Sequence, residues 1–141
     1  MGRVVVHLHG RPKERSMAAA IEVYTSRLSS RGVRVETHPA RMTVESYLAA
    51  VPSTARMVLL DERGVVRDSL SFASEVNAWQ LASEDVHLMV GPGDGWQGHA
   101  SDAERMSLSS LTMPHELAAV VLLEQVYRAT EIQRGSAYHR A

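Results

Sequence analysis

The sequence predicts an α/β fold with a mostly parallel sheet flanked by helices, and three observations lead to this prediction. Short apolar runs alternate along the chain with longer segments whose apolar residues recur at helical spacing. The apolar runs are nearly continuous, which is typical of strands that a parallel sheet buries on both faces. The chain has 141 residues, 45% of them apolar, and no linker or repeat, so we expect one domain over residues 1–141.

Four apolar runs are predicted as strands, and they lie at residues 4–8, 33–36, 57–60 and 86–90. We expect a turn at residues 61–64, where Asp-Glu-Arg-Gly follows the third strand, and a short strand-like piece around Leu108. Helical spacing predicts helices over residues 14–31, 43–50, 69–81 and from Pro114 to about Thr130.

Several residues are expected to set the ends and faces of these helices. Gly32 is a plausible C-cap of the first helix and Thr43 a candidate N-cap of the second. The third helix is expected to turn five apolar side chains inward, namely Leu70, Phe72, Val76, Trp79 and Leu81. Residues 117–123 are apolar almost all the way round, and a chain this short has little interior to bury such a helix. We therefore expect a homodimer formed through the last helix.

Composition excludes several classes of protein. The absence of cysteine excludes disulfides, a thiol nucleophile and cysteine-ligated metal sites. His7 and His9 share one face of a predicted strand, but no third ligand has a suggestive spacing, so we expect no metal. The apolar run near the N-terminus is too short for a signal peptide or a membrane span, which predicts a cytoplasmic protein without a membrane partner.

The net charge of −1 conceals an uneven distribution. Residues 1–70 carry 11 basic and 7 acidic groups, and residues 71–141 carry 4 and 9. Fourteen of the fifteen cations are arginine, which suits bidentate contacts with phosphate or carboxylate, although a simple solvated face explains them equally well.

Three segments carry candidate chemistry, and each also has an ordinary structural interpretation. Residues 91–95, Gly-Pro-Gly-Asp-Gly, follow a strand, where open α/β sheets place ligands, but a plain tight turn also fits. Residues 107–115, SLSSLTMPH, offer four hydroxyls to a heterocycle edge or simply to a helix N-terminus. Residues 138–140, Tyr-His-Arg, bring together three polar groups, but chain ends are often frayed.

Taken in order, three stretches of the sequence resemble the RlmH family of SPOUT methyltransferases. They are MVLLDERG, VHLMVGPGDGW and MSLSSLTMPHELAAVVLLEQVYRATEIQRGSAYHRA, and the likeness is densest over residues 107–141. The resemblance implies a SPOUT-type parallel sheet with a C-terminal trefoil knot, an exception to the usual unknotted chain. It also implies an obligate homodimer, S-adenosylmethionine as cofactor, and N3 methylation of a pseudouridine in large-subunit (23S) ribosomal RNA.

The resemblance assigns residues to two parts of a site. The cofactor would be bound by eight residues, namely Leu60, Gly91, Leu108, Ser109, Ser110, Leu111, Thr112 and Met113. The methyl acceptor would face four others, namely His115, Tyr138, His139 and Arg140, with one subunit's tail completing the other's pocket. An imide nitrogen must lose its proton before it attacks a methyl group, so His115 or His139 is a candidate base and Arg140 a candidate anion stabiliser.

The sequence also departs from the family pattern. Pro92 stands where the glycine loop usually has a second glycine, and Ala119 stands where the last helix usually has an arginine. The stretch between Pro39 and Met57 is shorter than usual, and the second half is acidic. These differences keep a second hypothesis open, a paralogue that methylates a small nucleoside-like metabolite with the same cofactor site. A third hypothesis is a scaffold that binds cofactor or RNA without catalysis.

Overall fold

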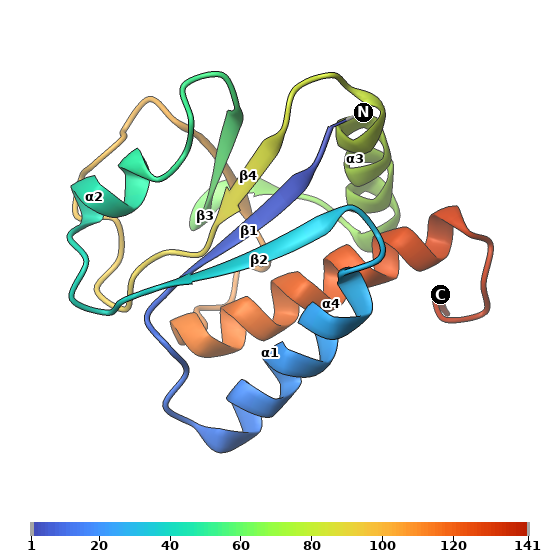
Figure 1. Ribbon diagram of the computed structural model, residues 1–141, viewed down its shortest axis with the longest axis horizontal. Coiled ribbons are helices and arrows are strands. Elements are labelled where there is room, and N and C mark those ends of the chain that lie inside the picture. The colour runs from blue at the N-terminus through green and yellow to red at the C-terminus, as the bar shows by residue number, and fades with distance from the viewer. Residues whose placement is uncertain (1, 141) are drawn as a thin grey trace.

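The computed structural model describes residues 2–140 and contains one five-stranded sheet (Figure 1). In chain order the elements are β1 (Val4–His9), α1 (Arg15–Leu28), β2 (Val33–His38), α2 (Val44–Ala49), β3 (Arg56–Val66), α3 (Ser69–Leu81), β4 (Val86–Met89), β5 (Glu104–Ser107) and α4 (His115–Gln133). The strand order is β2-β1-β4-β3-β5, and every neighbouring pair is parallel. This confirms the predicted α/β fold with a parallel sheet. The trefoil knot stays a prediction.

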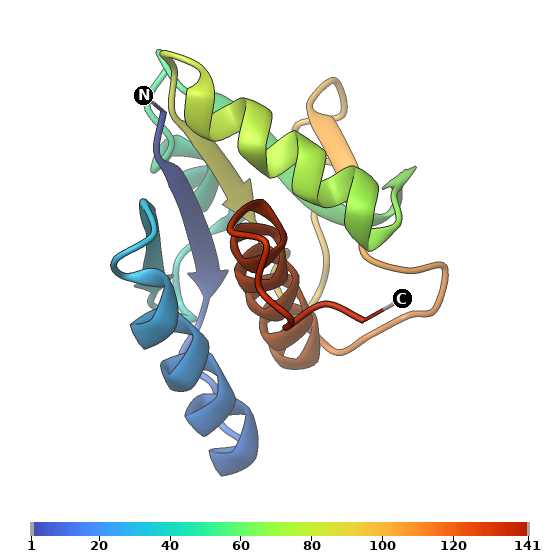
Figure 2. The ribbon, with the colours of Figure 1, turned by 90° about the vertical axis from the view of Figure 1, so that its right-hand side faces the viewer.

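The helices cover the two faces of the sheet unequally. Helices α1, α3 and α4 pack on one face, with α4 between the other two, and the short α2 lies on the opposite face (Figures 1 and 2). The larger core fills the three-helix side, whereas Tyr47, Leu59, Met89 and Trp96 form a smaller core under α2. No helix within residues 2–140 combines the length and apolarity needed to cross a bilayer.

Local sequence explains where the helices begin and which face they bury. Thr43 caps α2 as predicted, since its side chain accepts the backbone N–H of Ser46 at 3.1 Å. Phe72, Val76 and Trp79 of α3 are buried as expected.

Other helix predictions were wrong in detail. Leu70 and Leu81 are 55% and 69% exposed, because the face of α3 that packs on the sheet is narrower than the pattern indicated. Helix α1 ends at Leu28, before the predicted end at Arg31, and Gly32 is not its cap. With a φ of +72° Gly32 makes the turn into β2 instead, a conformation that favours glycine.

The predicted turn at residues 61–64 is a bulge within one long strand. Leu60 and Val65 both pair with Met106, so the residues between them leave the β3–β5 ladder and the strand then resumes in the same direction. Glycine is required inside this bulge, because a Cβ on Gly64 would lie 2.6 Å from the backbone nitrogen of Met106. The predicted strand at Leu108 is likewise misplaced, since β5 ends at Ser107.

The last helix is better covered by its own chain than its apolar pattern predicted. Helix α4 packs between α1 and α3 and against the sheet, and no residue from 117 to 132 is fully exposed. Ala119 is 3% exposed within the core, so in this chain the position serves helix packing. Four of the seven residues from 117 to 123 are nevertheless only partly buried in one chain, so the homodimer stays a prediction.

Candidate active site

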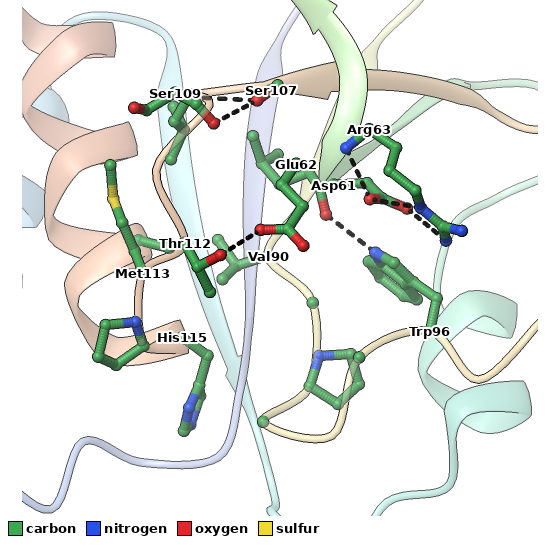
Figure 3. A pocket seen from close by; sticks show the side chains of 18 of the residues that line it. Asp61, Glu62, Arg63, Val90, Trp96, Ser107, Ser109, Thr112, Met113 and His115 are labelled. Atoms are coloured by element: carbon green, nitrogen blue, oxygen red, sulfur yellow. Dashed lines mark hydrogen bonds and ion pairs between the residues drawn. The ribbon is translucent and has the colours of Figure 1, made fainter.

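A cavity of about 710 Å³ opens where three chain segments meet at the carboxyl ends of the strands (Figure 3). The first segment is the bulge of β3, the second is the glycine loop that follows β4, and the third is the stretch between β5 and α4. Parallel α/β sheets place their ligands beyond the carboxyl ends of the strands, which makes this cavity the candidate active site.

The cavity brings together most of the residues that the sequence singled out for the cofactor. Seven of the eight line it, namely Leu60, Gly91, Leu108, Ser109, Leu111, Thr112 and Met113. Ser110 does not line it and is exposed to solvent. His115, from the group predicted to face the acceptor, lies at the edge of the same cavity.

Hydroxyls of the segment 107–112 hold the loop in shape. The sequence had predicted that they bind a heterocycle or cap a helix N-terminus. The Ser107 hydroxyl donates to the carbonyl oxygen of Ser109 at 2.8 Å, and the Ser109 hydroxyl accepts the backbone N–H of Leu111 at 3.0 Å. Thr112 donates to Oε2 of Glu62 at 2.7 Å. The two serine bonds are local and the Thr112 bond reaches β3, and together they fix the segment. Its backbone groups and apolar side chains therefore remain available to a ligand.

Trp96 anchors the glycine loop, although it was not among the residues predicted for the site. Its indole Nε1 donates to the carbonyl oxygen of Leu60 at 2.9 Å, and its ring stacks on Tyr47 with centroids 5.9 Å apart. A Cβ on Gly91 would lie 3.2 Å from that indole nitrogen, so a small residue keeps the loop close to β3. A tryptophan directly after a glycine loop is the signal that would have pointed to this anchor.

Two acidic residues of the β3 bulge reach the cavity but differ in their partners. Asp61 pairs with Arg105 at 3.0 Å and accepts the backbone N–H of Arg63 at 3.0 Å. Burial alone would raise the pKa of Asp61, but these hydrogen bonds lower it below its ordinary value. Glu62 accepts the Thr112 hydroxyl and makes none of the ion pairs found within residues 2–140, so its negative charge faces the cavity.

The C-terminal tail is held on its own helix, far from this cavity. The Tyr138 hydroxyl donates to Oε2 of Glu124 at 2.9 Å, and Nδ1 of His139 lies 3.0 Å from Nη1 of Arg128. Burial is the main reason that the pKa of Tyr138 is raised. Glu124 follows His115 by nine residues, so about 13 Å of helix separates them. The tail of a chain therefore lies apart from the cavity of the same chain (Figure 1).

A second cavity, of about 690 Å³, adjoins the first. The two share Pro92, Gly93 and His115 as a common wall. Arg11 and Lys13 also line the second cavity, and neither side chain takes part in the ion pairs of the described residues. His115 therefore lies on the wall between the two cavities, a position that its sequence neighbours did not reveal.

The two histidines that share a strand face do not act as a pair. Nε2 of His9 bonds to the carbonyl oxygen of Met42 at 2.7 Å, whereas Nδ1 of His7 lies 2.8 Å from Nε2 of His38. The predicted common face is correct, but the partners of His7 come from β2 and β4.

Comparison with known proteins agrees with this fold. A family model described as a predicted SPOUT methyltransferase matches residues 3–139. The chain therefore belongs to the SPOUT methyltransferase family.

Its curated relatives define the branch of that family. The chain is 45% identical to ribosomal RNA large subunit methyltransferase H of Albidiferax ferrireducens over 117 residues, which are 75% of this chain and 76% of that protein. It is 38% identical to the protein of the same name from Anaeromyxobacter sp. strain Fw109-5 over 146 residues, with 93% and 95% covered. These relatives place it in the RlmH family.

Solved structures share the fold at low sequence identity. TrmJ from Z. mobilis ZM4 matches with a TM-score of 0.52 and 11% identity, covering 92% of this chain and 70% of that one. Lpg2936 from Legionella pneumophila, whose structure contains bound SAM, matches with a TM-score of 0.51 and 11% identity, covering 91% and 66%. At this identity they support the fold alone.

Proposed function

We propose that this chain transfers a methyl group from S-adenosylmethionine to N3 of a pseudouridine in large-subunit (23S) ribosomal RNA. The observation that carries the proposal is the cavity between the glycine loop and residues 107–115, with His115 on the wall that it shares with the second cavity. The names of the curated relatives support the ribosomal substrate. A ribosomal substrate also implies that the protein acts in the cytoplasm.

The cavity suits S-adenosylmethionine in size, polarity and charge. Its volume lies within the range of small-molecule sites, and Leu60, Leu108 and Met113 offer apolar surface for the faces of an adenine ring. The carboxylate of Glu62 supplies negative charge to a cationic ligand. The bound cofactor supplies a methyl group already activated on a sulfonium, so the protein's task is to align it with an acceptor.

Hydrogen bonding favours His115 over His139 as the base. A guanidinium only donates, so Nδ1 of His139 accepts from Arg128 and the imidazole proton resides on Nε2. In this state His139 is a donor toward a substrate. His115 makes none of the side-chain hydrogen bonds found within residues 2–140, and it lines both cavities. We assign it to accept the N3 proton, which would leave a lone pair on that nitrogen for the methyl group that the cofactor would supply.

The RNA backbone is expected to contact the second cavity. Arg11, Lys13 and Arg41 belong to the basic first half of the chain, and none of the three joins an ion pair of the described residues. Cations without an ion-pair partner are available to bind phosphates, and their contribution to RNA affinity falls as the salt concentration rises.

A homodimer would bring the remaining predicted residues to the acceptor. Tyr138, His139 and Arg140 lie away from the cavity of their own chain, so we infer that the partner subunit's tail completes the site. Exposed apolar side chains support such an interface. Leu111 lines the cavity, and Val65, Val66 and Leu70 follow the β3 bulge along the chain. The anion formed at N3 would then be stabilised by an exposed guanidinium, that of Arg140.

The test is methylation of ribosomes from a strain that lacks the native enzyme. We expect nucleosides from those ribosomes to gain one methyl group on pseudouridine, measured by mass spectrometry. His115→Ala should abolish this gain while cofactor binding, measured by calorimetry, persists. Turnover of free pseudouridine with unmodified ribosomes would instead identify the small-metabolite paralogue. Cofactor binding without either product would identify a scaffold without catalysis.

A further inference from the structure

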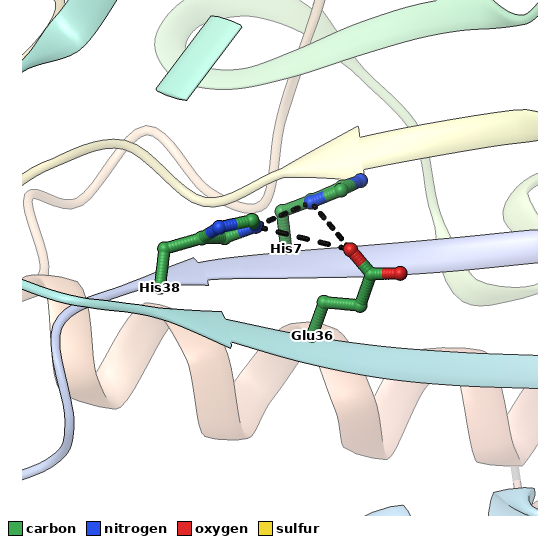
Figure 4. A group of neighbouring side chains, drawn as sticks. All are labelled: His7, Glu36 and His38. Atoms are coloured by element: carbon green, nitrogen blue, oxygen red, sulfur yellow. Dashed lines mark hydrogen bonds and ion pairs between the residues drawn. The ribbon is translucent and has the colours of Figure 1, made fainter. Parts of the chain in front are cut away.

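Three metal-ligating side chains converge on the α2 face of the sheet, on the opposite side from α1, α3 and α4 (Figure 4). His7 of β1 pairs in register with Glu36 of β2, and His38 lies two residues further along β2 on the same face. Nδ1 of His7 lies 2.8 Å from Nε2 of His38 and 3.7 Å from Oε2 of Glu36. The remaining edge, from Nε2 of His38 to Oε2 of Glu36, is 4.0 Å.

These distances match the edges of a small coordination polyhedron. A tetrahedral zinc ion with bonds of about 2.0–2.1 Å separates neighbouring ligand atoms by roughly 3.3–3.4 Å. The three observed edges fall on both sides of that value, so small side-chain rotations equalise them. Two imidazoles and one carboxylate are also a ligand set that zinc and similar borderline ions prefer.

Outer contacts already orient two of the three ligands. Nε2 of His7 lies 2.7 Å from Nδ1 of His87, so a proton on Nε2 leaves the Nδ1 lone pair facing His38 and Glu36. Oε1 of Glu36 forms an ion pair with Nη2 of Arg34 at 2.9 Å, and Oε2 lies toward the histidines. Protein metal sites use hydrogen bonds of this kind to fix the tautomer and orientation of their ligands.

The burial of the cluster favours the ligating form of its central histidine. His7 is fully buried, and this burial, followed by the neighbouring His87, lowers the pKa of His7 to about 4. The imidazole is therefore uncharged at neutral pH and keeps a lone pair for a metal. The cluster also reaches solvent, because the Glu36 side chain is 36% exposed.

We propose that His7, Glu36 and His38 bind a divalent transition-metal ion of the zinc type, with water in the fourth position on the solvent side of Glu36. The ion would join the edge strand β2 to β1 and would lie apart from the proposed cofactor cavity, whose lining contains none of these residues. Metal binding at this site can be measured without any assay of methyl transfer.

The experiment uses tag-free protein freed of metal with a chelator and titrated with Zn²⁺ by calorimetry and with Co²⁺ by visible absorption. We expect one ion per chain and the intense visible bands of tetrahedral Co²⁺. His38→Gln and Glu36→Gln should each weaken binding by about 10–100-fold. His99→Gln is the matched control, since His99 lies outside the cluster, and it should leave binding unchanged.

Three results would overturn the proposal. They are the absence of saturable binding, an affinity that His38→Gln and Glu36→Gln leave unchanged, and a loss caused equally by His99→Gln. Circular dichroism of each variant establishes that it is folded. Two variants are used because both altered side chains are partly exposed, so at least one is expected to keep the native fold.

Discussion

Tyr47 joins the ends of two strands beneath the cavity. Its ring is fully buried, and its hydroxyl oxygen lies 2.7 Å from the carbonyl oxygen of Val90 and 2.9 Å from that of His7. Burial raises the pKa of Tyr47 above its ordinary value, so the hydroxyl stays protonated as a donor. Since Val90 precedes the glycine loop, this one side chain helps to set where the loop begins.

Tyr47→Phe is expected to destabilise the fold by roughly 1–3 kcal/mol, because buried carbonyl groups lose their donor while the ring stacking is kept. Urea unfolding followed by circular dichroism measures the change. Tyr24→Phe serves for comparison, since Tyr24 is only partly buried, and should cost less. Equal losses in the two variants would contradict the role assigned to Tyr47.

Thr112→Arg is expected to weaken binding of S-adenosylmethionine at least about tenfold, because the larger cation fills the cavity and displaces the contact with Glu62. Ser110→Arg is the matched control two residues away, exposed and outside the cavity lining. It should bind normally in the same calorimetric titration. A larger effect at Ser110 would place the cofactor elsewhere.

These residues mark how far a site can be predicted from sequence. The segment 107–115 and Gly91 were identified through a motif, and the structure brings all of these residues except Ser110 to one cavity. The roles of the Ser107 and Ser109 hydroxyls were not predictable, because each bonds to a backbone group whose position depends on the loop itself. Glu62 gave no signal either, since it is an ordinary acidic residue until the bulge directs it toward Thr112.

At the scale of elements, the bulge in β3 builds one wall of the cavity. It displaces Asp61, Glu62 and Arg63 from the ladder between β3 and β5. Gly64 permits this path, because the backbone of Met106 passes too close for any side chain at that position.

Gly64→Ala is expected to cost at least roughly 1–3 kcal/mol, the usual effect of overpacking, and to weaken cofactor binding as the bulge shifts. Thermal unfolding with and without S-adenosylmethionine measures both effects. At Gly93 a Cβ meets nothing closer than 3.4 Å, so the stability of Gly93→Ala should stay near that of the parent chain. If Gly64→Ala were as stable as the parent chain, β3 and β5 would have to move apart at this position at little cost, which would contradict the prediction.

Element boundaries were harder to predict than element types. Periodicity identified every helix, and it also identified four strands. A bulge and a turn share the same local sequence, and only the pairing of Leu60 and Val65 with Met106 distinguishes them. Leu70 and Leu81 have the correct helical spacing but lie beyond the face that α4 and the sheet cover.

At the scale of the whole molecule, the tail and the cavity lie at different places along α4. Tyr138 and His139 dock near Glu124 and Arg128, whereas His115 begins the helix at the cavity. If the partner subunit's tail completes each site, one chain can supply the cavity with His115 and the other chain can supply the tail.

A mixture of two inactive variants should therefore recover activity. His115→Ala keeps an intact tail, and Arg140→Ala keeps an intact cavity, so a mixed dimer contains one complete site. Random exchange of subunits is expected to restore about a quarter of the parent rate in the ribosome methylation assay. No recovery after verified subunit exchange would mean that each chain uses its own tail.

The parallel architecture was predictable because continuous apolar runs alternate with helical periods along the chain. The cover on α4 was not, because whether a helix is enclosed depends on how its neighbours are placed, and α1 and α3 come from distant parts of the sequence. The grouping of His7, Glu36 and His38 depends on strand register, which an isolated sequence pattern does not specify.

The strand order has a consequence for the way the chain folds. Strand β1 pairs with β4, so Val4 meets Val86 only after most of the sequence has been synthesised. Closing so long a loop before its contacts form is entropically unfavourable and slows folding. During translation the edge of β1 that later pairs with β4 therefore stays unpaired, and in that interval this valine-rich strand can associate with other chains.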